Sequence, residues 1–240
     1  MEKYLTLLSF SEGGWGMAFL AATGMTIALT VCIAPLGFAL GLAVALMQRS
    51  KHAVWRWPAT VFSSLFRSLP ELLTLFIVYF GLHILLQAVL RWFGYQAHIS
   101  INAFFAGVLA LALVAAAFAS EVWLGALRVI DRSQWEAARA LSLSRTKTFS
   151  AVLFPQALKN ALPMLANNWL TVLKDTSLVS TIALVEIMRQ SRLAAIQSGE
   201  ALFFFGTGCV LYLLLSAFSD ALFRRLEKYS HRPEKAERAK

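Results

Sequence analysis

The stretch that decides the fold is AFFAGVLALALVAAAFASEVWLGAL, residues 103–127. Its first 18 residues, 103–120, contain no charged side chain. A helix needs about 20 predominantly apolar residues to cross a bilayer, because each residue adds about 1.5 Å and the hydrocarbon layer is about 30 Å thick. This stretch therefore predicts a membrane-spanning helix.

Runs of the same character recur along the chain, in which 58% of the 240 residues are hydrophobic. Backbone N–H and C=O groups in lipid must be bonded internally, so long apolar runs predict helices rather than the short alternating strands of a barrel. We predict an all-α, polytopic membrane protein with about five transmembrane helices, bent at Pro35 and Pro70. The predicted spans are residues 17–47, 59–90, 103–127, 162–185 and 201–223.

Basic residues lie mostly on one side of these spans. Short loops rich in Lys and Arg stay in the cytoplasm, which predicts an N-terminus outside and a C-terminus inside. The same asymmetry accounts for the net charge of +9 without a nucleic-acid partner, since basic side chains at a membrane contact anionic lipid headgroups. The predicted cytoplasmic basic residues before the C-terminal tail are Arg49, Lys51, Arg56, Arg128, Arg132, Arg139, Arg145, Lys147, Lys159, Arg224 and Arg225.

Motifs of catalytic or metal sites are missing from the sequence. It contains no glycine loop for nucleotides, no nucleophile elbow and no HExxH pattern, and its four histidines have no ligand spacing. Cys32 and Cys209 fall within spans, where a thiol is by default a small apolar side chain. We expect a non-catalytic chain that binds no cofactor itself, and a membrane-embedded enzyme is disfavoured.

A polar, basic segment interrupts the apolar runs: EAARALSLSRTKTFSAVLFP, residues 136–155. Ser133 is expected to cap a first helix, with Glu136 three residues later as in a capping box. Residues 142–144 interrupt that helix, and a second helix is expected to run to a stop at Pro155. The pattern predicts two short cytoplasmic helices at an angle. It is equally typical of an interfacial linker in which Glu136 only caps its own helix.

This segment resembles the EAA loop of the permease subunits of ABC importers. Glu136, Ala137 and Ala138 match its start, and Ser142 stands where the family has glycine. A serine there would be strained if the turn needs a left-handed backbone. Leu124 stands where the family commonly has arginine. Further stretches similar to the polar amino acid uptake permeases are RSLPELLTLFIVYFGL (67–82), AFASEVWLGAL (117–127) and NNWLTVLKDTSLVS (167–180), and Val152, Phe154 and Pro155 match the loop ending.

The resemblance implies a type I ABC importer permease fold and the transmembrane subunit of an ATP-driven importer in a bacterial plasma (inner) membrane. The nearest likeness is to permeases for histidine, lysine, arginine, ornithine or opines. Implied partners are a second permease subunit (a copy or a sister), two ATPase subunits that hold ATP and Mg²⁺, and an extracytoplasmic amino-acid-binding protein. The residues expected to couple the chain to its ATPases are Glu136, Ala137, Ala138, Arg139, Ser142 and Arg145.

The resemblance also suggests a division of the chain. Residues 1–226 would form the transmembrane permease domain, with the coupling loop at about 128–160. Residues 227–240 are charged and lack apolar periodicity, which predicts a flexible cytoplasmic tail.

Charged residues inside the predicted spans are costly in lipid and must face a partner, a cavity or a substrate. Arg67 and Glu71 are four residues apart, so one interpretation is that they neutralise each other. Glu121 has no basic residue near it in sequence, which favours a cation, or equally a salt bridge to Lys174. An ion site at Glu121 would instead indicate a secondary carrier or channel. The residues assigned to the path of a basic amino acid are Arg67, Glu71, Glu121, Asn168, Lys174, Asp175, Thr176 and Ser177.

Small and aromatic residues suggest how the helices pack and where they meet the interface. Gly37 and Gly41 form a GxxxG pair extended by Ala45, which predicts close approach of another helix, although glycine and alanine are common in membrane helices generally. Tryptophan anchors helices at membrane interfaces. The tryptophans near predicted interfaces are Trp55, Trp57, Trp92 and Trp135.

Overall fold

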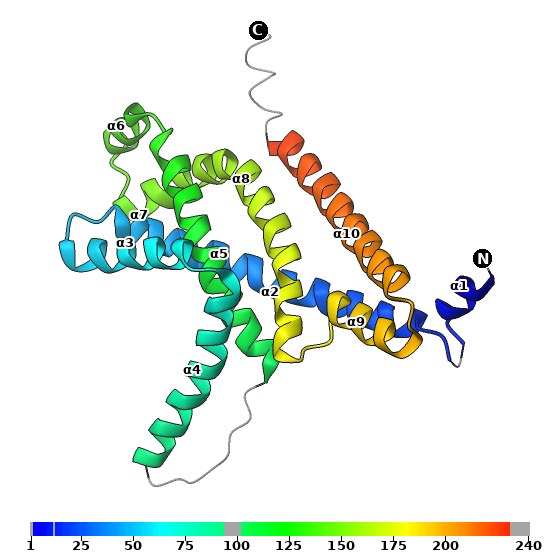
Figure 1. Ribbon diagram of the computed structural model, residues 1–240. Coiled ribbons are helices and arrows are strands. Elements are labelled where there is room, and N and C mark those ends of the chain that lie inside the picture. The colour runs from blue at the N-terminus through cyan, green and yellow to red at the C-terminus, as the bar shows by residue number, and fades with distance from the viewer. Residues whose placement is uncertain (1, 12, 94–101, 231–240) are drawn as a thin grey trace.

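The computed structural model describes residues 2–11, 13–93 and 102–230. Within those ranges the chain forms helices and no strands, as the all-α prediction requires (Figure 1). The elements in chain order are α1 (Glu2–Leu7), α2 (Gly16–Gln48), α3 (Ala53–Ser68), α4 (Glu71–Trp92), α5 (Ala103–Arg128), α6 (Arg132–Ala140), α7 (Arg145–Lys147), the π-helix η1 (Thr148–Leu153), α8 (Phe154–Asp175), the 3-10 helix η2 (Thr176–Ile182), α9 (Ile187–Ser198) and α10 (Ala201–Ser230).

Four helices of the described chain, α2, α4, α5 and α10, are long and apolar enough to cross a membrane. The predicted span 162–185 differs from the structure at both ends. Its helix, α8, begins at Phe154 and ends at Asp175, and a 3-10 helix follows. Lys159, Lys174 and Asp175 make α8 less apolar than the four spanning candidates, and it packs against α5, α10 and α2.

The predicted span 59–90 is wrong as a single helix, because the chain breaks at Leu69 and Pro70. Leu69 is extended, with φ −87° and ψ 141°, and Pro70 precedes the first residue of α4. Proline removes a backbone donor and disfavours a helical residue before it. The predicted bend at Pro70 is thus a full change of direction between α3 and α4 (Figure 1), whereas α2 continues through Pro35.

The core is built around the contact of α2 with α5. A Cβ added at Gly37 would lie 2.7 Å from Ala115 Cβ, and one added at Gly41 would lie 2.7 Å from Ala119 Cβ. Both distances are shorter than van der Waals contact. Ala45, the next residue in the row, is fully buried. The predicted close approach at the GxxxG pair is confirmed, with α5 as the partner helix.

Helix α6 and the C-terminal end of α10 lie on one side of the helical body (Figure 1). Figure 1 shows α6 beyond the ends of α5 and α8, and α9 toward the opposite end of α8. Helix α10 continues to Ser230, three residues past the predicted start of the tail at residue 227. The rest of the predicted tail, residues 231–240, lies outside the described residues.

Candidate functional site

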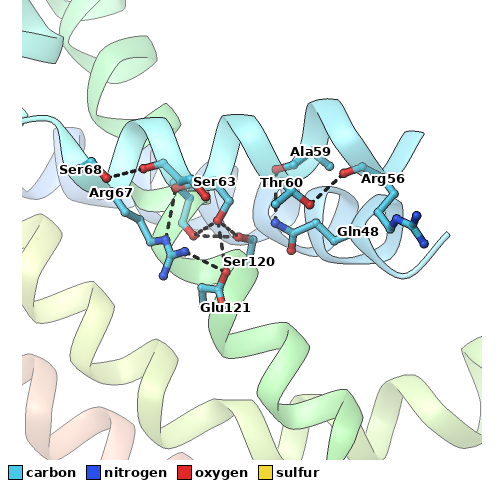
Figure 2. A network of polar contacts seen from close by, with 11 residues as sticks. Gln48, Arg56, Ala59, Thr60, Ser63, Arg67, Ser68, Ser120 and Glu121 are labelled. Carbon is cyan, nitrogen blue, oxygen red and sulfur yellow. Dashed lines mark hydrogen bonds and ion pairs between the residues drawn. The ribbon is translucent and has the colours of Figure 1, made fainter. Parts of the chain in front are cut away.

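Glu121 has a partner that the sequence did not indicate. Arg67 Nη2 of α3 lies 3.1 Å from Glu121 Oε1 of α5, and the two side chains are 35% and 40% exposed. Arg67 Nε also donates to the Ser63 carbonyl at 3.2 Å, so the guanidinium is held in place (Figure 2). The expectation of an unpaired Glu121 is wrong, and the described structure has neither an Arg67–Glu71 nor a Glu121–Lys174 ion pair.

Two serines complete this network between α3 and α5. Ser63 and Ser120 are buried, their hydroxyl oxygens lie 3.0 Å apart, and Ser63 Oγ donates to Glu121 Oε1 at 3.4 Å. Ser120 Oγ also donates to the Ala117 carbonyl at 2.7 Å. Small hydroxyl side chains allow two membrane helices to approach while bonding polar groups between them. Ser63 lies one turn before Arg67 on α3, but the sequence does not distinguish it from Ser64 and Ser68 on the same helix.

Glu71 and Asp175 form a second, acidic site. Glu71 lies in the first turn of α4, and Asp175, the last residue of α8, is half-buried. Helix α4 contacts η2, which begins directly after Asp175. Burial acts most strongly on the Asp175 carboxylate, the Glu71 carboxylate adds a weaker repulsion, and Lys174 offsets part of it. The structure therefore brings together two of the predicted path residues that are far apart in sequence.

The other predicted path residues have local roles that the structure records. Thr176 is buried, and its hydroxyl donates to the Leu173 carbonyl at 2.7 Å. Asn168 is also buried, and its amide donates to the Ala115 carbonyl at 3.4 Å, which joins α8 to α5. Ser177 is half-buried in η2, and the Lys174 side chain is exposed. Asn168 and Thr176 therefore contribute to packing, whatever else they contact.

The EAA segment forms an exposed helix–turn–helix knob. The cap of α6 is Asp131 rather than Ser133, because the Ser133 N–H donates to Asp131 Oδ1 at 2.7 Å, which lowers the pKa of that carboxyl. Glu136 is 68% exposed and pairs with Arg132 at 3.3 Å. Pro155 does not stop the second helix: the π-helix η1 runs directly into α8, and Pro155 lies in the first turn of α8.

The turn of the knob is strained at the predicted position. Ser142 has φ 54°, the left-handed conformation that favours glycine. Its N–H donates to the Arg139 carbonyl at 2.9 Å, and the Leu143 N–H donates to the Ala138 carbonyl at 3.1 Å. The turn leaves Leu141 75% exposed, an apolar side chain on the knob that the sequence reading did not single out. Arg139 and Arg145 are exposed on the same knob, Ala138 is buried, and Ala137 is exposed.

A buried carboxylate at the start of α9 was also missed. Glu186 is fully buried and accepts hydrogen bonds from Met188 N at 2.9 Å, Arg189 N at 2.8 Å and Tyr212 Oη at 2.7 Å. It caps α9 and ties that helix to α10. Its position directly after an apolar run could have marked Glu186 as a candidate site residue, but nothing in the sequence indicated its contact with Tyr212.

Comparison with known proteins identifies the family. Residues 37–230 match the model of the family described as binding-protein-dependent transport system inner membrane component. The chain is 35% identical over 229 residues to the octopine transport system permease protein OccQ of Rhizobium meliloti, covering 95% of this chain and 97% of that protein. It is 37% identical over 203 residues to the arginine ABC transporter permease protein ArtQ of Haemophilus influenzae, covering 85% and 89%.

Solved structures agree with this assignment. An amino acid ABC transporter crystallised with histidines matches with a TM-score of 0.75 and 28% identity, covering 90% of this chain and 95% of that one. The MetNI methionine ABC transporter, in an inward-facing conformation, matches with a TM-score of 0.72 at 19% identity, which supports the fold alone. The type I importer permease fold is thus confirmed. The chain belongs to the family of binding-protein-dependent transport system inner membrane components.

Proposed function

We propose that this chain is the transmembrane subunit of an ATP-driven importer for basic amino acids or opines. The relatives that cover nearly its whole length are named as octopine and arginine permeases. The observation that favours a cationic substrate is the contact of α4 with η2, which sets the Glu71 carboxylate against that of Asp175. A cation placed between two carboxylates relieves their mutual repulsion, so such a site favours an ammonium or guanidinium group over a neutral one.

The remaining path residues suit the other end of an amino acid. Ser177 lies two residues from Asp175 on η2, and the exposed Lys174 ammonium is a suitable partner for an α-carboxylate. Glu121 is a poor ion site by comparison, because Arg67 and Ser63 already satisfy one of its oxygens. That pairing removes the observation that favoured a secondary carrier or channel.

The knob formed by α6 and α7 is proposed to dock onto an ATPase subunit. Glu136, Arg139 and Arg145 present exposed charges, and Leu141 adds an exposed apolar contact. An apolar anchor surrounded by charged residues is typical of a helix that binds in the groove of a partner protein. Two ATPase subunits holding ATP and Mg²⁺, a second permease subunit and an extracytoplasmic binding protein complete the proposed assembly.

Reconstitution in vesicles tests the transport claim. The permease is incorporated with its ATPase and binding protein, and uptake of labelled arginine is followed with ATP, without ATP and without the ATPase. We expect uptake only with ATP and every subunit present. Uptake that persists without the ATPase would show a secondary carrier and overturn the proposal.

A charge reversal tests the docking claim separately. Glu136→Lys is expected to abolish ATP-driven uptake and retention of the ATPase during purification, since losing one partner of a close charge pair costs about 2–5 kcal/mol, or about 30-fold or more in affinity. Glu227→Lys makes the same change at the cytoplasmic end of α10 and is expected to retain the ATPase. Normal uptake by the Glu136→Lys permease would remove the knob from the coupling interface.

A further inference from the structure

A cavity of about 600 Å³ lies where α2, α3, α5 and α6 meet, separate from Glu71 and Asp175. Its wall contains four arginines: one directly after α2, one each from α3 and α5, and a fourth from the start of α6, together with apolar side chains of α5. The arginines are Arg49, Arg56, Arg128 and Arg132.

The positive charge of this cavity is largely uncompensated. Glu121 is its one acidic lining residue, and it is paired with Arg67. Arg132 pairs with Glu136 at 3.3 Å, but in the described parts of the chain Arg49, Arg56 and Arg128 form no ion pair. Three guanidinium groups around one cavity favour an anion, and their planar donors suit phosphate oxygens in particular.

The cavity also lies at the ends of candidate membrane-spanning helices. It opens where two spanning helices end, since α2 ends at Gln48 and α5 ends at Arg128. Its third wall, α3, is an amphipathic helix that exposes Trp55 and Trp57, the latter by 71%. Exposed tryptophans on an amphipathic helix mark the boundary between lipid tails and water.

One hydrogen bond fixes this wall against α2. Gln48 Nε2 donates to the Ala59 carbonyl at 3.2 Å, and Thr60 Oγ1 donates to the Arg56 carbonyl at 2.9 Å (Figure 2). Gln48 Oε1 is buried and accepts no hydrogen bond from the described residues. The wall that carries Arg56 is therefore positioned before any ligand arrives, and an acceptor remains for a hydroxyl donor.

We propose that this cavity binds the phosphate headgroup of an anionic phospholipid in the leaflet on the side of α6. Arg49, Arg56 and Arg128 would contact the phosphate, and Leu124 and Leu127 would contact the first carbons of the lipid. A glycerol headgroup, as in phosphatidylglycerol, would donate a hydroxyl to Gln48 Oε1. Basic pockets between membrane helices on the cytoplasmic side have this chemistry. The site is independent of amino-acid import and stands even if the proposed substrate is wrong.

Lipid retention by the assembled transporter tests the site directly. The complex is purified in neutral detergent and titrated with phosphatidylglycerol, with phosphatidylcholine or with inorganic phosphate, and bound lipid is counted by native mass spectrometry. We expect saturable retention of phosphatidylglycerol, weak retention of phosphatidylcholine, and no displacement by millimolar inorganic phosphate. Displacement by phosphate with no lipid retained would show a site for the free ion and overturn the lipid assignment.

Two matched pairs of substitutions locate the bound lipid. Arg49→Gln with Arg56→Gln is expected to weaken retention on the order of 30-fold, because two basic residues near an anionic surface contribute about that much to binding. Arg225→Gln with Lys228→Gln removes the same charge from α10 and is expected to leave retention unchanged. Thr60→Trp narrows the cavity while keeping every arginine, and it is expected to weaken retention.

Three outcomes would overturn the proposal. Equal weakening by the α10 pair would show diffuse surface attraction, as would undiminished retention in Thr60→Trp. Loss of the ATPase from the Arg49 and Arg56 variant with unchanged lipid retention would show that the arginines contact a protein partner. Each variant is first checked for normal yield and a single species on size exclusion, so that retention is compared between folded transporters.

Discussion

Arg67 and Glu121 join α3 to α5 through a single ion pair of 3.1 Å, backed by the Ser63–Ser120 contact of 3.0 Å. Helix α3 precedes the break at Pro70, and α5 leads into the knob formed by α6 and α7. The pair therefore connects the element before Glu71 with the element that leads into the knob. Movement of the knob would reach α3 through this contact.

We expect the loss of one charge alone to be more harmful than the loss of both charges together. Glu121→Gln leaves a partly exposed guanidinium without its charged partner, and Arg67→Gln leaves a partly exposed carboxylate without its partner. Removing both charges leaves neither of these unpaired groups. We expect each single variant to lower thermal stability and uptake, and the double variant Arg67→Gln with Glu121→Gln to recover part of both losses.

The coupling energy from this double-mutant cycle should be about 1 kcal/mol, because both side chains are partly exposed and solvent screens them. Uptake kinetics separate a structural role from a binding role. If Glu121→Gln changed the KM for arginine while the double variant recovered nothing, Glu121 would contact substrate and the pairing would be incidental.

The sequence predicted the elements whose signal is local and missed those set by contacts between distant segments. The predicted helix 103–127 matches α5 to within one residue, because an unbroken apolar run in a membrane protein predicts a helix. The run 59–90 concealed a break, since hydropathy continues across Leu69 and Pro70 although the backbone direction does not. The partner of Glu121 could not be predicted, because nothing in either helix encodes which faces meet.

Strain at Ser142 could be predicted from the sequence, because serine stands at the one position where the family has glycine. With φ 54°, Ser142 keeps a Cβ where glycine has none. Ser142→Gly is expected to stabilise the protein by about 1 kcal/mol, whereas Ser133→Gly, within α6, should destabilise it by about 0.5 kcal/mol. Tryptophan fluorescence during thermal unfolding measures both, and a lower Tm for Ser142→Gly would show that the serine hydroxyl, rather than the backbone, matters at the turn.

The α2–α5 contact should not tolerate one added methyl group. A Cβ at Gly41 would meet Ala119 Cβ at 2.7 Å and the Ala116 carbonyl oxygen at 2.9 Å, and the latter is backbone that cannot move aside. Gly41→Ala is expected to cost about 1–3 kcal/mol by overpacking. Gly24→Ala is the matched control on the same helix, because no atom lies within 4 Å of its added Cβ. Equal melting temperatures for the two variants would contradict the close approach.

Tyr212 is expected to stabilise the protein through the buried Glu186 carboxylate. Tyr212→Phe removes a 2.7 Å donor but leaves the Met188 and Arg189 N–H groups in place. We expect the free energy of unfolding to fall by about 1–2 kcal/mol. This is toward the lower end for a hydrogen bond to a charged acceptor, because two other donors to Glu186 remain. Tyr229→Phe makes the same change at a residue that is 75% exposed and should leave the Tm unchanged. A similar Tm for both variants would show that the Tyr212 hydroxyl contributes nothing.

The acidic pair makes the sharpest prediction about substrate. Glu71 and Asp175 repel each other in the empty site, so a cationic side chain gains from both carboxylates and a neutral side chain gains from neither. Glu71→Gln and Asp175→Asn are each expected to raise the KM for arginine about tenfold, the effect of roughly 1.4 kcal/mol. Uptake of citrulline, which has the same shape without the charge, should change little. If both variants impaired arginine and citrulline equally, the carboxylates would support the fold of the path rather than recognise the charge. In that case Glu71→Asp, which keeps the charge, should impair arginine uptake as well.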